Sequence, residues 1–168
     1  TIDSVTGFAA GTDKVHFDIS LLETAGAVLA GVTQDYNEIF DNNSSATAAI
    51  TTQTLTGAGT AADGIGMFLI DLGATKFANA AAAVDALETG GGAALTFAGS
   101  VAADDAFLIA YENNTSGINI ASANFAAADD NSGGAAATGG ANLESADLVT
   151  LTGITDVTTL SGDFSFIA

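Results

Sequence analysis

Oxygen-bearing side chains stand at both ends of an expected strand near the start of the chain. Asp13 directly precedes residues 14–19, where apolar and polar residues alternate, and Asp18 lies near the end of that segment. Carboxylate and carbonyl oxygens are the ligands that Ca²⁺ prefers. We therefore expect both carboxylates to lie within reach of a single Ca²⁺ ion, together with backbone carbonyls. The alternative is local: Asp13 is a turn residue whose side chain bonds its own backbone.

A second group of oxygen ligands lies in the last third of the chain. Asp129, Asp130 and Asn131 are consecutive, and Glu144 or Asp147 is the expected further ligand. The spacing is not that of an EF-hand loop, so the pattern points to Ca²⁺ only through the chemistry of its ligands. Outside a cell, a site fills at an affinity of only about 10⁻⁴ to 10⁻³ M.

The sequence offers little for other kinds of chemistry. His16 is the only histidine and there is no cysteine, so transition-metal sites, disulfides and thiolate catalysis lack their usual groups. A serine triad would need this histidine beside a placed serine and acid, and no Gly-x-Ser-x-Gly motif supports one. We expect no enzyme activity, and we expect His16 to be a surface or pairing residue.

The charge balance excludes several partners. Twenty Asp and Glu face only Lys14 and Lys76, which gives a formal net charge of −18. Nucleic acids and anionic membrane surfaces attract basic patches, which two lysines cannot form. No apolar run approaches the roughly 20 residues of a membrane helix, so we expect no membrane insertion. A cation such as Ca²⁺ is the natural partner of these acids, although acidic groups also serve solubility alone.

Short runs of Val, Ile, Thr and Phe, separated by Gly, Asn and Asp, indicate a chain built mainly of strands. The strands are expected over residues 2–8, 14–19, 28–33, 46–56, 65–72, 93–97, 106–112, 117–125, 147–151 and 164–167.

One amphipathic helix is expected over Thr75–Thr89. Its apolar residues recur at three- and four-residue steps, Thr75 would cap its start, and Gly90 suits a left-handed exit. Residues 129–142 are low in complexity and predict an exposed loop. We expect a single β-rich domain over residues 1–168, a β-sandwich or β-roll-like stack with this helix packed on it. The expected helical face consists of Phe77, Ala80, Ala81, Val84 and Leu87.

Both ends of the chain resemble one known family. Residues 2–22, IDSVTGFAAGTDKVHFDISLL, resemble the segment that follows the calcium-binding repeats of RTX proteins. The residues that match the signature are Gly11, Asp13, Lys14, Asp18 and Ser20. Residues 106–125 are similar to a hairpin of that family. Residues 146–168 look like its terminal strands, with the closing Asp-Phe-x-apolar tail. The glycine-rich nonapeptide repeats are absent, and Gly7 replaces the acid that usually precedes the Phe.

The resemblance implies a route out of the cell. In RTX proteins this region caps a β-roll and carries an uncleaved C-terminal signal, which the type I export machinery reads. The resemblance therefore implies a secreted protein, extracellular or on a bacterial cell surface, and Ala168 as its C-terminus. The residues that match the signal are Asp163, Phe164, Phe166 and Ile167.

The expected function is structural. Proline-free strands with small Ala, Gly and Thr side chains suit contacts between subunits, so we expect a homo-oligomer or polymer, as in a surface layer or filament, whose folding Ca²⁺ promotes. One alternative is an adhesin domain that binds surface glycans through Ca²⁺, although Tyr36 and Tyr111 are the only tyrosines and there is no Trp to stack on sugars. Another is a passive secretion cap.

Overall fold

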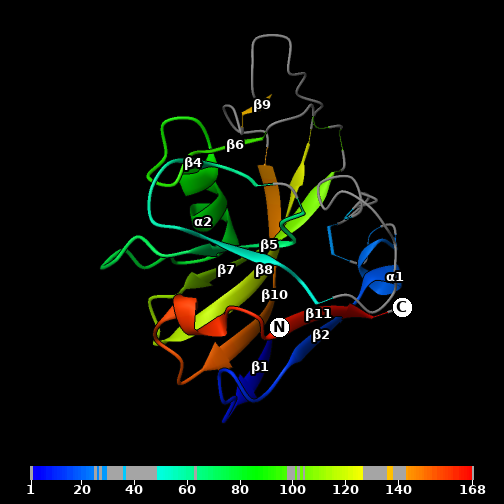
Figure 1. The fold of residues 1–168 in the computed structure, drawn as a ribbon, viewed down its shortest axis with the longest axis vertical. Helices are drawn as coiled ribbons and strands as arrows, with labels where there is room; N and C mark the ends of the chain where they lie inside the picture. The colour runs from blue at the N-terminus through cyan, green and yellow to red at the C-terminus, as the bar shows by residue number, and fades with distance from the viewer. Residues whose placement is uncertain are drawn as a thin grey trace.

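Strands make up most of the molecule, and one helix of more than a single turn packs against them (Figure 1). This computed structural model describes residues 2–24, 26, 28–29, 36, 49–62, 64–97, 101, 103, 105–126, 136–137 and 143–167. The predicted mainly β, sandwich-like fold with one amphipathic helix is confirmed. The elements are β1 (Asp3–Thr6), β2 (Val15–Asp18), α1 (Ile19–Leu22), β3 (Thr52–Leu55), β4 (Gly59–Thr60), β5 (Met67–Ile70), α2 (Ala80–Leu87), β6 (Leu95–Phe97), β7 (Ala106–Glu112), β8 (Gly117–Phe125), β9 (Ala136–Ala137), β10 (Leu143–Thr152), the 3₁₀ helix η1 (Val157–Leu160) and β11 (Phe164–Ile167).

A six-stranded mixed sheet forms the centre, in the order β1-β10-β8-β7-β5-β3. Only β8 is antiparallel to its neighbours, so the other five strands all run in one direction. β7 and β8 form the hairpin expected over residues 106–125, and its last pair is Glu112 with Ile118. Two smaller sheets, β11-β2 and β4-β6-β9, complete the set.

The central sheet is covered on both faces, which is why the inner strand β5 is apolar at every position. Successive side chains of a strand point to opposite faces, and all four residues of β5 are buried. Met67 and Leu69 pack with β11 and η1, whereas Phe68 and Ile70 pack with α2 and β6. Two apolar cores therefore lie on either side of one sheet.

The helix is shorter than the sequence predicts, because the residues before it are held in extended form. Phe77 pairs with Asn113 as an isolated parallel bridge, and its N–H donates to the Glu112 carbonyl at 3.0 Å. Asn79, not Thr75, caps the helix by accepting from the Ala82 N–H at 3.0 Å. The buried face is Ala80, Ala83, Val84 and Leu87, while Ala81 is exposed. Gly90 has φ 90°, as its predicted exit role requires.

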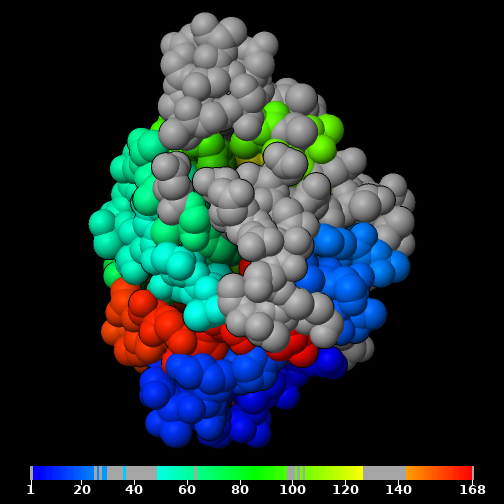
Figure 2. Space-filling view, turned by 45° about the vertical axis from the view of Figure 1, so that its right-hand side comes forward, coloured from blue at the N-terminus to red at the C-terminus, as the bar shows by residue number. Residues whose placement is uncertain are grey.

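The first strands of the chain pair with the last ones. β1 lies parallel to β10, with Asp3 opposite Val149, and β2 lies parallel to β11, with Val15 opposite Phe164. Figure 2 shows the N-terminal residues in blue directly against the C-terminal residues in red. The turn expected between residues 10 and 13 therefore joins two strands that belong to different sheets.

Several expected boundaries change. Of the strand expected over residues 46–56, the described residues 49–56 contain an isolated bridge at Ala49 and β3, and the strand expected over 147–151 extends to all of β10. Within the loop expected over 129–142, β9 pairs with β6, so that segment is not wholly irregular. Val28 and Leu29 form a bend rather than a strand, and residues 30–33 lie outside the described residues.

Candidate functional site

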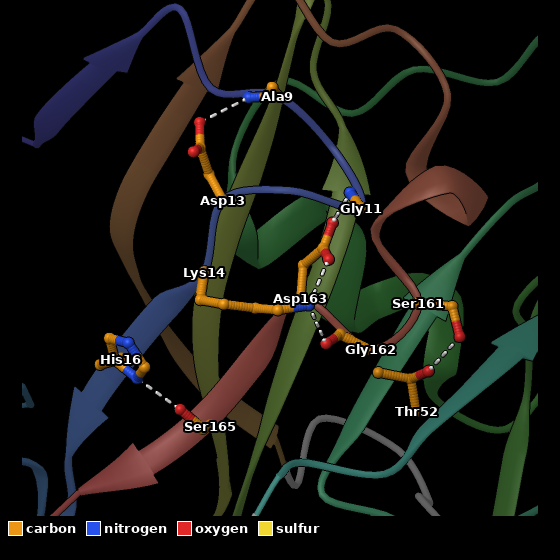
Figure 3. A network of polar contacts seen from close by, with 10 residues as sticks. All are labelled: Ala9, Gly11, Asp13, Lys14, His16, Thr52, Ser161, Gly162, Asp163 and Ser165. Carbon is orange, nitrogen blue, oxygen red and sulfur yellow. Dashed lines mark hydrogen bonds and ion pairs between the residues drawn. The ribbon is translucent and has the colours of Figure 1, made fainter.

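The carboxylate of Asp163 connects the two ends of the chain. Its side chain is only 1% exposed, and it sits between the end of η1 and β11. Lys14 Nζ lies 2.9 Å from Oδ1, and the Gly11 N–H donates to Oδ2 at 2.7 Å (Figure 3). Lys14 Nζ also donates to the Gly162 carbonyl at 2.8 Å. We call Gly11, Lys14, Gly162 and Asp163 the terminal clasp.

Asp13 lies beside this clasp but bonds locally. Its Oδ2 accepts the Ala9 N–H at 2.9 Å across the turn (Figure 3), which is the local role considered for it above. The residue is exposed, so its second oxygen remains accessible to solvent ions.

Asp18 caps the short helix α1 at the other end of β2. Oδ1 accepts from the Ser20 hydroxyl at 2.6 Å and from the Leu21 N–H at 3.2 Å. These hydrogen bonds, that of Ser20 first, favour the ionised form and lower the pKa of Asp18 below its ordinary value.

The strand between Asp13 and Asp18 keeps them apart. β2 alone spans roughly 10 Å at about 3.3 Å per residue, whereas ligands of one Ca²⁺ ion lie about 2.4 Å from it. A single ion cannot bridge carboxylates at opposite ends of an extended strand. The expectation of one shared ion is therefore not supported, and any Ca²⁺ here would bind the two acids separately.

Asp147 anchors helix α2 to the central sheet. It lies where the pairing of β10 with β8 shifts register, and its Oδ2 accepts the Ala80 N–H, in the first turn of the helix, at 3.2 Å. Oδ1 accepts from the Tyr111 hydroxyl and from Asn119 Nδ2, the latter at 3.1 Å. A carboxylate at a helix start is also favoured by the helix dipole.

The same polar network continues towards the β7–β8 turn. Asn119 Oδ1 accepts from Asn113 Nδ2 at 2.7 Å and from the Thr150 hydroxyl at 3.0 Å. Asn113 Oδ1 accepts from the backbone N–H groups of Thr115 and Gly117. The side chains thus satisfy one another in the interior, so Asp147 serves as a structural anchor with both oxygens engaged.

The remaining predicted ligands are not placed together by the structure. Asp129, Asp130 and Asn131 lie outside the described residues. Within the described ranges, no three His, Asp or Glu side chains gather where they could hold a metal ion. Ca²⁺ binding therefore stays a prediction.

The residues that match the export signal form a packed strand. Phe164 and Phe166 of β11 are buried, at 1% and 9% exposure, in the core that covers one face of the central sheet. Ile167 is 38% exposed. Phe164 O also accepts the Ile50 N–H at 2.9 Å, so this tail is tied to the middle of the chain as well as to β2.

His16 pairs with Ser165 on the neighbouring strand, as expected for a pairing residue. The contact joins His16 Nδ1 to Ser165 Oγ (Figure 3). Both residues lie on the outer side of β2 and β11, and His16 is exposed. Among the described residues no acid contacts the other ring nitrogen, so the pair lacks the third group of a triad.

Sequence reasoning missed the interior roles of Lys14, Tyr111 and Asn119. Lys14 was assigned only to a family signature, yet it holds a buried carboxylate 149 positions away. The only signal in the sequence was that the chain has two lysines and twenty acids. Because a buried acid needs a cation most, each lysine could be expected to pair with one, and Lys76 does so with Glu112.

The chain matches no protein-family model, no curated protein and no solved structure. None of the helices among the described residues is long and apolar enough to span a membrane.

We predict that Asp163→Asn destabilises the protein by about 1–3 kcal/mol, because charge-assisted hydrogen bonds at a buried carboxylate are lost. Asp13→Asn is the matched control: it lies in the same turn region, is exposed, and retains an oxygen that can accept from Ala9. We expect it to change stability by less than about 1 kcal/mol. Urea denaturation followed by far-ultraviolet circular dichroism measures both. Equal effects of the two substitutions would contradict the clasp.

We predict that neither tyrosine ionises in the folded protein near its ordinary pKa of 10.0. Burial raises the pKa of both Tyr36 and Tyr111, and for Tyr111 the hydrogen bond to Asp147 adds to it. The resulting stabilisation is complete below pH 10 and is lost as the pH rises beyond it, because the unfolded chain releases these protons first.

A spectrophotometric titration of tyrosinate, run beside circular dichroism, tests this. We expect ionisation and unfolding to coincide. Tyr36→Phe leaves one tyrosine and so assigns each signal. Ionisation near pH 10 without loss of circular dichroism would disprove the burial of that hydroxyl.

Proposed function

We propose that this chain is an extracellular structural module that assembles with copies of itself, and that Ca²⁺ promotes its folding and assembly. The observation that carries the proposal is the pair of open edges of the central sheet. β1 and β3 are its outermost strands, and among the described residues neither pairs with a further strand. An unpaired strand edge is a template for another chain.

Neither edge strand contains Lys, Pro or a bulge, three of the features that blunt natural edges, although both strands are short, at four residues each. β1 reads Asp-Ser-Val-Thr and β3 reads Thr-Gln-Thr-Leu, and the register of each with its inner neighbour is unbroken. Asp3 is the single charge on the two strands. The edges therefore support association between subunits.

The net charge permits association. A surface of 7330 Å² shared among 18 net negative charges leaves about 400 Å² for each, a spacing of about 20 Å. The screening length at physiological salt is about 8 Å. Repulsion between copies is largely screened, and bound Ca²⁺ would lower it further by neutralising two charges per ion.

Ca²⁺ is the proposed counter-ion of the surface acids, because no lysine is left to pair with them. Both lysines are engaged by Asp163 and Glu112, so cations that balance the other acids must come from solution. An ion that binds only the folded form stabilises it by mass action. At low Ca²⁺ inside the cell folding would be disfavoured, and outside it would be favoured.

The terminal clasp supports an exported module. Among the described strands β2 pairs only with β11, so this sheet forms only once residues 164–167 are available. A tail that is buried in the folded protein can be read by export machinery only before folding. Delayed closure would therefore keep the chain competent for export by the type I route.

The glycan-binding alternative draws less support from the side chains. Tyr36 and Tyr111 are both fully buried, so neither offers a face for stacking on a sugar. Of the described phenylalanines only Phe8 is not buried, and it is half-buried. A non-enzymatic structural role remains the better proposal.

Light scattering with electron microscopy on the purified protein, titrated with Ca²⁺ and then with chelator, tests the proposal. We expect ordered sheets or filaments that grow with Ca²⁺ and dissolve in chelator. Mg²⁺ at the same ionic strength is the control for screening. A monomer under all conditions would exclude the assembly role, and equal assembly and stability in excess chelator would exclude the role of Ca²⁺.

A further inference from the structure

Resting on the proposed assembly function, we infer that copies join head to tail, with β1 of one copy parallel to β3 of the next. The direction of the strands carries this inference. β1 and β3 close opposite edges of the same sheet and run in the same direction, since β8 alone is reversed. A parallel β1–β3 pair therefore continues the sheet from one copy into the next with its two faces preserved.

The exposure of β1 suits it for such a contact. All four of its residues are exposed, and Ile2 and Val5 are 43% and 40% exposed, which is high for large apolar side chains. The Thr152 hydroxyl donates to the Val5 carbonyl at 2.8 Å and, with the β10 pairing, fixes β1 in place. The edge is thus a formed strand rather than a loose end.

β3 offers a matching edge of the same length. Its inner side pairs with β5, and the Thr52 hydroxyl contacts Ser161 Oγ at 3.1 Å, which holds the strand against η1. Thr54 is exposed. Because β3 carries no charge, Asp3 of an incoming β1 would meet no acid on this edge.

Unlike edges are favoured over like ones because each copy then uses both of its edges. A two-fold dimer through β1 would leave both β3 edges open, and one through β3 would leave both β1 edges open. The head-to-tail contact satisfies both edges and, being heterologous, propagates into a fibre.

The geometry of the fibre follows from the sheet. Six strands about 4.8 Å apart give a rise of about 29 Å per subunit. A twist of roughly 20–25° between neighbouring strands gives a rotation of about 120–150° per subunit. A filament of copies joined in this way would show these values in helical reconstruction.

Engineered cysteines test the contact directly, since the chain has none of its own. Val5 and Thr54 lie on the same face of the sheet: Val5 pairs with Leu151 of the core on the β11 side, and Thr54 alternates with Leu55 of the core on the α2 side. Within one copy the two edges are about 24 Å apart across five strand spacings, beyond the reach of a disulfide.

After assembly in Ca²⁺, the double variant Val5→Cys/Thr54→Cys is treated with oxidant or with a short bis-maleimide. The bis-maleimide can still link the two cysteines if the register between β1 and β3 differs by one residue pair. We expect a ladder of covalent multimers on denaturing gels. Each single variant should stay monomeric. Dimers from a single variant, or assemblies of the double variant without a ladder, would overturn the head-to-tail contact and leave the proposed function standing. No assembly of the unmodified protein would overturn both.

A charge on the edge provides a second test. Thr54→Lys places a solvated cation on β3, and Thr75→Lys, at an exposed threonine outside the strands, is its control. We expect Thr54→Lys to raise the protein concentration needed for assembly about tenfold or more, equivalent to about 1.4 kcal/mol, and Thr75→Lys to leave it within about twofold. Circular dichroism confirms that both variants fold. Equal effects of the two substitutions would contradict a β3 contact.

Discussion

The parallel pairing of the first strands with the last ones is the constraint on which the rest of the fold depends. β2 and β11 form the layer that covers one face of the central sheet, and Phe17, Phe164 and Phe166 are its aromatic contribution to that core. Parallel neighbours cannot be joined by a tight turn, so the whole chain lies between them. Closing so long a loop costs entropy before any contact compensates for it. The ion pair between the exposed Lys14 and the buried Asp163 lies at the point where this loop closes.

The acids divide into two populations with different physical consequences. Among the described residues Asp105, Glu112 and Asp163 are buried; lysines pair with Asp163 and Glu112, and the half-buried Asp147 accepts from a phenol, an amide and a backbone N–H. Because a buried unpaired charge is costly, the two cations of the chain are committed to this task. The surface acids consequently have no protein cation to balance them. The negative charge left on the molecular surface thus follows from where the two lysines are placed.

The sequence predicted where strands lie better than it predicted which strands and side chains pair with one another. The hairpin over residues 106–125 was predictable because it is local and its apolar run is bounded by turn residues. The pairing of β2 with β11 left no comparable signal, since register between segments 149 positions apart depends on tertiary packing. Thr75 failed as a helix cap because the bridge between Phe77 and Asn113 holds the preceding residues extended. At the candidate ion site the sequence identified two carboxylates of the kind that bind Ca²⁺, but the extended strand β2 separates Asp13 from Asp18. Periodicity had already indicated that strand, and its length is what rules out a shared ion.

If residues 164–167 direct export, the same tail would serve first as a signal and then as a strand, and would have to satisfy two requirements at different times. β11 alternates buried phenylalanines with Ser165 and Ile167, which are not buried, a pattern that gives one apolar face to the core. Before folding, the same apolar residues are available to a receptor; after folding they are not, and their burial would make release effectively irreversible. If the tail directs export, recognition and folding exclude one another, and the free energy of closing the clasp favours the folded, exported state. Of the two open edges, β1 forms only once β10 is in place, because β1 pairs with β10, whereas β2 and β11 belong to a separate sheet. The proposed assembly through β1 would therefore wait for the folding of β10, late in the chain.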